Sequence, residues 1–344
     1  MEPSAYTDAA ARVLGYVRRT PLVPAAPSPR DRDRSDLWFK PECLQVSGSF
    51  KARGAFNAVL SLPEDIRRRG VVTASGGNFG AAIAYAAREL GVPASVCVMT
   101  GSTRLARQRI ASFGAELHVV GEHWDLSWEH GKKLAEEKGG ALLHPFADAP
   151  VIAGQGTIGL EILEDMPDVD TVIVAIGGGG LIGGIAEAIK QRRPDVRIVG
   201  VEAAGCPMMY ESHKAGHIVK IENFVTNVPI LAARTTETIN FDLAERCVDE
   251  LVLVPEDEPV PALLRHRGRD MAILGREVVV KEQDAHLLSP AGAATGSRSS
   301  PARSIPAHAS RAINQIEIVT GYSCHPYQHR AAGRDARSGF ERVP

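Results

Sequence analysis

The 344-residue sequence has few aromatic residues, at 5%, and no apolar run long enough to span a membrane. Its net charge is only −2, so it lacks the charge that accompanies binding to nucleic acid or to an anionic membrane. No basic stretch followed by an apolar core opens the chain, so no secretory signal is predicted. These absences favour a cytoplasmic protein with neither nucleic acid nor membrane as a partner.

A cysteine framework is also lacking. The five cysteines are scattered and form no Cys-x-x-Cys pair; they are Cys43, Cys97, Cys206, Cys247 and Cys324. An odd, dispersed set indicates reduced thiols rather than disulfides or a zinc site.

What the sequence does contain is a regular alternation of short apolar runs and helical patterns. Units of this length imply parallel strands joined by right-handed crossovers, and therefore an α/β fold with two lobes. The expected strands are Leu37–Phe39, Val71–Thr73, Ala94–Val98, Glu116–Val120, Thr171–Ile176, Arg197–Glu202 and Ile316–Val319. The expected helices are Ala5–Arg18, Phe50–Leu60, Asn78–Leu90, Thr103–Phe113, Trp124–Glu137, Ile152–Glu164 and Leu181–Gln191.

A run of four glycines, Gly177, Gly178, Gly179 and Gly180, directly follows the apolar strand Thr171–Ile176 and opens a helix. Consecutive glycines at this point expose bare N–H groups, and the helix dipole adds to their attraction for an anion. We interpret the run as a phosphate cradle. The alternative is a turn whose glycines serve only tight packing. The dinucleotide motif Gly-x-Gly-x-x-Gly is not present after an early strand.

A lysine lies at the start of another expected helix, in the segment 49–55, Ser-Phe-Lys-Ala-Arg-Gly-Ala. Segment 47–49, Ser-Gly-Ser, predicts a turn and a helix cap, which places Lys51 in the first helical turn. The helix dipole disfavours positive charge there, so a lowered pKa is expected, and a neutral amine is the form that makes an imine. An ordinary solvated lysine is the alternative.

A third segment, 75–80, Ser-Gly-Gly-Asn-Phe-Gly, again joins a strand to a helix, and its amides are suited to a carboxylate. The three segments, in this order, resemble the pyridoxal-phosphate-dependent serine/threonine dehydratase family, which includes serine racemase. The resemblance extends from about Arg19 to about Glu258 and becomes patchy after Val280.

The resemblance implies a fold-type II enzyme with two open parallel-sheet α/β lobes and the pyridoxal phosphate site between them. Residues 1–67 and 151–280 would form the large lobe, and residues 70–147 a smaller inserted lobe. Residues 281–344 are atypical, and we expect much of this segment to be poorly ordered. A homodimer acting on a small amino acid is also implied.

The resemblance assigns a role to individual residues. Lys51 is the catalytic residue and binds the cofactor. The other cofactor-binding residues are Phe50, Asn78, Gly177, Gly178, Gly179, Gly180, Leu181 and Thr320. The substrate-binding residues are Ser75, Gly76, Gly77, Asn78 and Gln155. Simpler roles stay open for three of them: core packing for Phe50, and helix capping for Asn78 and Gln155.

Two positions bear on which reaction this scaffold performs and on whether it binds a metal ion. Racemisation needs a proton donor opposite the lysine, and a serine supplies it in sequences that resemble serine racemase. Gly76 has no side chain, so dehydration is favoured over racemisation. Glu202 matches a position that binds a divalent cation in the family, but Met208 replaces the second ligand, so no metal is predicted.

The sequence departs from the family pattern in places. Histidine is usual where Phe79 stands, and an aspartate-glycine loop is missing near Ile230–Thr236. After the expected late strand, Thr320-Gly321 is followed by Tyr-Ser rather than Gly-Asn. The expected function is dehydration of serine or threonine to a 2-oxo acid and ammonia. The alternatives are a racemase or other β-eliminating enzyme, and a cofactor-binding protein whose activity has decayed.

Overall fold

The computed structural model describes residues 1–24, 37–226, 228–229, 231–255 and 315–319. All of them belong to one compact unit, Met1–Val278 with Ile305–Tyr322. The described helices are α1 (Ala5–Val13), α2 (Lys51–Ser61), α3 (Glu64–Arg69), α4 (Asn78–Leu90), α5 (Arg104–Ser112), α6 (Trp124–Lys138), α7 (Ala149–Asp165), α8 (Gly180–Lys190), α9 (Met208–Ala215) and α10 (Thr238–Cys247), with a 3-10 turn, η1 (Glu42–Leu44). No helix among the residues described is both long and apolar enough to cross a membrane.

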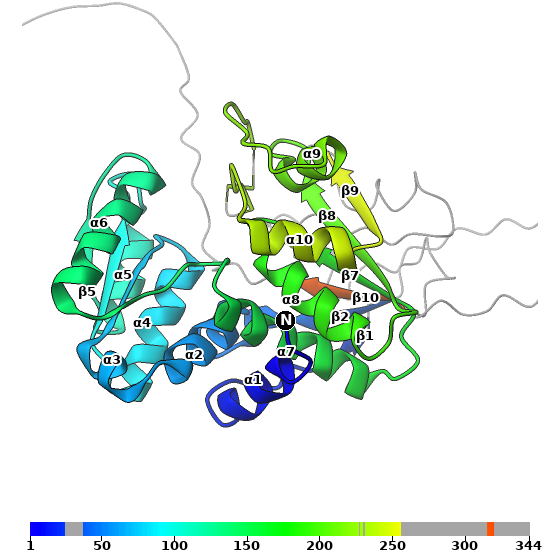
Figure 1. Cartoon of the computed structure of the whole chain (residues 1–344), viewed down its shortest axis with the longest axis horizontal. Coiled ribbons are helices and arrows are strands. Elements are labelled where there is room, and N and C mark those ends of the chain that lie inside the picture. Colours follow the sequence, from blue (N-terminus) through cyan, green and yellow to red (C-terminus); the bar gives the residue numbers. More distant parts are fainter. Residues whose placement is uncertain (25–36, 227, 230, 256–314, 320–344) are drawn as a thin grey trace, which may run out of the picture. The chain divides into compact units, whose positions relative to one another are not determined.

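The larger sheet has the strand order β1-β2-β10-β7-β8-β9 (Figure 1). Its strands are β1 (Val23–Pro24), β2 (Leu37–Pro41), β7 (Thr171–Ala175), β8 (Arg197–Ala203), β9 (Glu250–Val254) and β10 (Gln315–Val319). Only the pairing of β1 with β2 is antiparallel. The expected late strand is confirmed: β10 pairs with both β2 and β7, so residues distant in sequence complete the middle of the sheet.

The smaller sheet is parallel throughout, with the order β5-β4-β3-β6. Its strands are β3 (Val71–Ala74), β4 (Ala94–Val98), β5 (Glu116–Val119) and β6 (Ala141–Leu142). Alternate residues of β4 face opposite layers: Val96 and Val98 pack against α4 and α5, and Cys97 packs against α6. Helices therefore cover both faces, as expected for parallel sheets.

The core of the larger sheet lies between its apolar strands and helices α7 and α8. Val172 and Val174 of β7 pack with Ile162 of α7 and Ile185 of α8, and all four are buried. Ile173, on the opposite face of β7, is buried as well, so both faces of the strand are covered, which explains its run of apolar residues.

The first helix is shorter than the sequence predicts. We expected a helix over Ala5–Arg18, but α1 ends at Val13. Leu14 leaves the helical conformation and Gly15 has φ +85°, a backbone that only glycine adopts readily. The chain therefore turns before the proline that was expected to end the helix.

Candidate active site

Lys51 is the first residue of α2, and its amine is enclosed by protein although part of the side chain is accessible. Desolvation lowers the pKa of Lys51 to about 7. Its Nζ donates a 2.7 Å hydrogen bond to the carbonyl oxygen of Pro145 and lies 5.0 Å from the Phe50 ring centre and 5.6 Å from that of Phe79. The direction of the shift agrees with the prediction, and burial is its cause.

The segment before Lys51 is a tight turn but not a helix cap. Ser49 is fully buried, and its hydroxyl has no hydrogen-bond partner among the described residues. Phe50 occupies the capping position instead, without a side-chain bond. The predicted serine cap is therefore wrong. The turn itself is confirmed, because Gly48 has φ +74° and its N–H bonds to the carbonyl oxygen of Gln45.

The loop 75–77 leads from β3 into α4 and holds the predicted substrate residues Ser75, Gly76 and Gly77. A Cβ on Gly76 would lie 2.5 Å from Oγ of Ser102, so a neighbouring hydroxyl fills the space of its missing side chain. Asn78 is the first residue of α4, and the residue before it, Gly77, occupies the cap position without a side-chain bond. The capping alternative for Asn78 does not hold. The N-terminus of α4 still presents its amides at this loop.

The glycine run forms the turn from β7 into α8. Gly179 has φ +89°, and Gly180 is the first residue of α8. A Cβ on Gly178 would lie 2.6 Å from the Phe146 ring, and one on Gly180 would lie 2.3 Å from the Phe146 carbonyl oxygen. Close packing thus explains two of these glycines. It does not compete with anion binding, because the N–H groups at the start of α8 still point along the helix axis.

Two residues that the sequence did not indicate hold this turn in place. Thr236 Oγ1 and Asn240 Nδ2 donate hydrogen bonds of 3.0 and 2.9 Å to the carbonyl oxygen of Gly178. Asn240 Nδ2 also lies 3.1 Å from the carbonyl oxygen of Phe146. No element was predicted over 238–247, so nothing in the sequence pointed to Asn240 or to this contact.

Gln155 lies inside α7, six positions after the helix begins at Ala149, and is only 1% exposed. The capping alternative for Gln155 is therefore wrong. Within the described chain, neither its Oε1 nor its Nε2 has a hydrogen-bond partner. An unpaired buried amide costs about 1–3 kcal/mol, and a bound group that hydrogen-bonds it would remove this cost. The Nε2 of Gln155 faces α2, where a Cβ on Gly54 would lie 2.4 Å from it.

Phe50 and Leu181 belong to the apolar core of the larger sheet. Phe50 is 9% exposed, and its ring also lies near the Lys51 amine, so its packing role and its place beside the site coexist. Leu181 follows the glycine turn as predicted, at the second position of α8. Thr320 lies outside the described residues.

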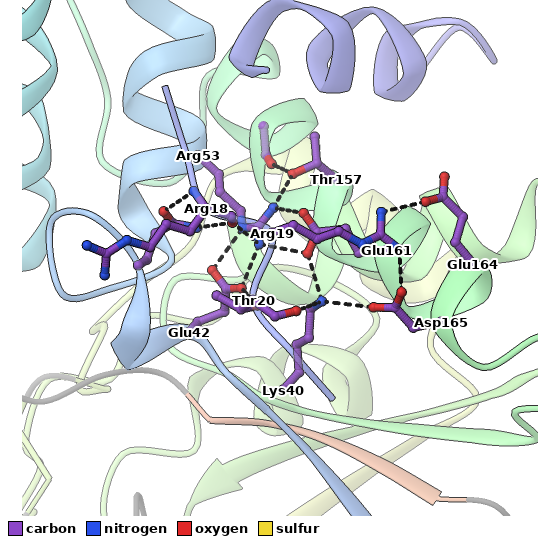
Figure 2. A network of polar contacts seen from close by, with 12 residues as sticks. Arg18, Arg19, Thr20, Lys40, Glu42, Arg53, Thr157, Glu161, Glu164 and Asp165 are labelled. Carbon is purple, nitrogen blue, oxygen red and sulfur yellow. Dashed lines mark hydrogen bonds and ion pairs between the residues drawn. The ribbon is translucent and has the colours of Figure 1, made fainter. Parts of the chain in front are cut away.

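A buried network of charged residues anchors α2 at Arg53, two residues after Lys51 (Figure 2). Arg53 is fully buried and is bonded to Glu42, beside β2, and to Glu161 of α7. Lys40 of β2 pairs with the same Glu161 at 2.7 Å. The backbones also meet closely, because a Cβ on Gly154 would lie 2.6 Å from the Cα of Gly54. The helix of Lys51 and the helix of Gln155 are therefore held together by charge and by glycine contact.

His144 lies in the segment between β6 and α7, next to the carbonyl that Lys51 contacts. Burial and the nearby Lys51 charge lower the pKa of His144 to about 4, so this imidazole is neutral at pH 7. Its Nδ1 accepts hydrogen bonds from the N–H groups of Phe146 and Ala147 at 3.3 and 3.0 Å. His144 was not among the residues predicted for the site.

Glu202 is buried and bonded to the backbone through both of its carboxylate oxygens. It accepts hydrogen bonds of 2.9 Å from the N–H groups of Met209 and Tyr210, and burial raises the pKa of Glu202 to about 7. In the described ranges, no three His, Cys, Asp or Glu residues come together as a metal would require.

The chain belongs to the family described as pyridoxal-phosphate dependent enzymes, whose model matches residues 13–273. An L-threonine ammonia-lyase of Thermotoga maritima is 40% identical over 229 residues, which are 67% of this chain and 57% of the relative. One of Geobacter sulfurreducens is 39% identical over 253 residues, covering 74% of this chain and 63% of the relative. The chain thus spans only about three fifths of the length of these relatives.

Solved structures agree with the predicted fold class. Maize serine racemase matches with a TM-score of 0.70 at 33% identity, covering 74% of this chain and 76% of the other. Serine racemase from Dictyostelium discoideum matches with a TM-score of 0.72 at 27% identity, covering 93% and 97%. The resemblance to serine/threonine dehydratases and the fold-type II architecture are thereby confirmed.

The described residues suit pyridoxal phosphate on three physical grounds. Lys51 offers an amine that is partly neutral at pH 7. The turn at Gly177–Gly180 offers helix N-terminal amides for a phosphate. The buried amide of Gln155 needs a partner that the described chain does not supply.

Proposed function

We propose that the protein is a pyridoxal-phosphate-dependent ammonia-lyase that dehydrates serine or threonine to a 2-oxo acid and ammonia. The observation that carries the proposal is the desolvated Lys51 amine at the start of α2, with its pKa lowered to about 7. The named activity of the ammonia-lyase relatives, at 39–40% identity, supports the same reaction.

Each site residue has a role in this proposal. The N–H groups at the start of α8 would bind the cofactor phosphate, and Asn78 would hydrogen-bond the cofactor ring. The start of α4 and Gln155 hold the substrate carboxylate. When bound, pyridoxal phosphate supplies an electron sink that makes the substrate Cα proton acidic.

Lys51 would be both the attachment point of the cofactor and, once the substrate amine has displaced it, the base. Its neutral amine takes the proton from the substrate Cα and gives it to the departing β-hydroxyl, which leaves as water. The unsaturated amine that is released takes up water and yields the 2-oxo acid and ammonia. His144, with a pKa of about 4, is neutral and adds no competing positive charge beside the Lys51 amine.

Racemisation is the second candidate, because serine racemases are among the structural neighbours. It requires an acid on the face opposite Lys51. Gly76 has no side chain to provide one, which favours dehydration; the Ser102 hydroxyl that fills its space is a candidate donor, and the chiral analysis below tests it. A protein that binds the cofactor without catalysis is the third candidate.

Three further expectations stay predictions. They are the division into lobes at 1–67 with 151–280 and at 70–147, a homodimeric state and a cytoplasmic location.

Ammonia release tests the proposal directly. The protein, loaded with pyridoxal phosphate, is incubated with serine or threonine, and ammonia and the 2-oxo acid are measured in equal amounts over many turnovers. Chiral analysis of the unreacted serine separates lyase from racemase. Absence of ammonia with either amino acid, while the cofactor is bound, would leave only the binding protein or the racemase.

A further inference from the structure

Arg109 extends from α5 to two loops that each lead to a predicted site residue. Its Nη2 donates a hydrogen bond to the carbonyl oxygen of Ser47, and its Nη1 lies 3.5 Å from Oδ1 of Asn78. Ser47 precedes Lys51 by four residues, and Asn78 begins α4. One side chain therefore links the segment that leads to Lys51 with the loop that presents Asn78.

The turn before Lys51 is shaped to admit this guanidinium. Gly48 has φ +74°, and a Cβ built on it would lie only 2.9 Å from Nη2 of Arg109. A larger residue would meet both backbone strain and the guanidinium. The glycine thus allows Arg109 to reach the Ser47 carbonyl oxygen behind it.

Among the described residues, Arg109 lacks the carboxylate partner that other buried cations have. Arg53 and Lys40 are each paired with glutamates, whereas no carboxylate in the described part of the chain is paired with Arg109. Its guanidinium is half-buried, and desolvation lowers the pKa of Arg109. Its contacts are to oxygen atoms of the two site loops, which is the arrangement of a positioning group rather than of a stabilising ion pair.

We propose that Arg109 is a positioning residue for the reaction at Lys51: it orients the Asn78 amide and fixes the distance between the Asn78 loop and the Lys51 segment. An amide oxygen that faces a guanidinium turns its NH2 group the other way, and this NH2 is the donor that Asn78 needs for the cofactor ring. The proposal rests on the proposed function, because it assumes the roles given to Asn78 and Lys51.

The same helix supplies a matched control. Arg104 is exposed at the start of α5, so Arg104→Gln removes the same charge from the same helix without touching either loop. Arg107 is unsuitable, because it bonds to the carbonyl oxygens of Met99 and Thr100 and holds the loop before α5.

The test is a double-mutant cycle on the full chain, built from Arg109→Gln and Asn78→Ala. The dissociation constant of pyridoxal phosphate is measured by quenching of tryptophan fluorescence in the apoprotein, and kcat and KM are measured with threonine. We expect Arg109→Gln to weaken cofactor binding about tenfold in the wild-type background and less than about twofold in the Asn78→Ala background. Arg104→Gln is expected to leave the dissociation constant, kcat and KM unchanged.

Equal losses in both backgrounds, or no loss from Arg109→Gln, would overturn the positioning role while leaving the proposed function intact. A wild-type chain that does not bind the cofactor would overturn both. Arg109→Lys, which keeps the charge but can reach only one of the two oxygens, guards against a folding defect in the glutamine variant. It is expected to bind the cofactor with intermediate affinity at an unchanged melting temperature of the apoprotein, and wild-type affinity would contradict the role.

Discussion

Arg53, two residues after Lys51, forms a fully buried ion pair with Glu42 through two hydrogen bonds. Arg53 Nε lies 2.8 Å from Glu42 Oε2 and its Nη2 lies 2.7 Å from Oε1, and both side chains are 0% exposed. The remaining side of the guanidinium meets Glu161 of α7 at 2.6 and 2.9 Å. The site lysine is therefore carried by a helix whose first turn is locked to two other elements.

Removal of Arg53 should cost far more than removal of a surface cation. Arg53→Ala leaves Glu42 buried and unpaired, and we expect the free energy of unfolding to fall by about 3–5 kcal/mol. Arg68→Ala, which breaks an exposed pair with Glu64 at 3.6 Å, should change it by less than about 1 kcal/mol. Urea unfolding of the apoproteins measures both. Similar losses in the two variants would show that the buried pair is not special.

Attachment of the cofactor should follow the titration of Lys51. Only the neutral amine reacts with a carbonyl, and burial lowers the pKa of Lys51 to about 7 instead of its ordinary 10.5. The rate at which the apoprotein takes up pyridoxal phosphate should therefore rise as pH increases through about 7 and level off above it. Stopped-flow absorbance between pH 5.5 and about 9 records this profile. A rate that keeps rising steadily toward pH 9 would mean that the amine is not desolvated.

The pH dependence of stability tests the lowered pKa of Lys51 in a second way. Because the pKa of Lys51 is lowered in the folded protein, the unfolded chain binds more protons between about pH 7 and 10.5. This lysine therefore contributes stability that increases with pH across that window. Lys51→Met should lose that increase, which equilibrium unfolding of both proteins at pH 7 and about pH 9 reveals as a difference in slope.

Gly178→Ala tests the glycine turn. The added methyl group would lie 2.6 Å from the Phe146 ring, so the turn must shift, and we expect weaker cofactor binding and a lower melting temperature. Gly101→Ala is the control, because a Cβ at Gly101 meets nothing within 4 Å. Fluorescence titration and thermal unfolding follow both effects. An unchanged affinity in Gly178→Ala would remove the turn from the cofactor site.

Gly76→Ser tests why the chain favours dehydration. Its Cβ would lie 2.5 Å from Ser102 Oγ, so Gly76→Ser alone should lower activity, and pairing it with Ser102→Ala should recover stability. We expect the double variant to exchange the Cα proton of recovered substrate with D2O and to release some of the opposite enantiomer. Mass spectrometry and chiral chromatography detect these outcomes. No racemised product from a folded double variant would show that a hydroxyl at this position is insufficient.

Local patterns predicted the elements on which the site is built, because they depend on neighbouring residues. The bounds Asn78–Leu90 and Ala94–Val98 match α4 and β4, and the glycine run opens α8 as expected. The strand 316–319 was also expected, and it lies in β10.

Contacts between residues far apart in the sequence could not be predicted from local patterns. Arg53 and Glu161 are 108 residues apart, and nothing in the sequence around either residue indicates the other. The same holds for Arg109 with Ser47, and for the desolvation that sets the pKa of Lys51. Helices α3, α9 and α10 and strands β1, β6 and β9 were not predicted.

The visible absorbance spectrum of the protein with pyridoxal phosphate, recorded beside Lys51→Ala, tests the central claim most directly. The account predicts an absorbance band of lysine-bound cofactor in the wild-type protein, absent from Lys51→Ala and shifted when serine or threonine is added. The same spectrum in both proteins, or no band in either, would contradict the assignment of Lys51 and the lyase function with it.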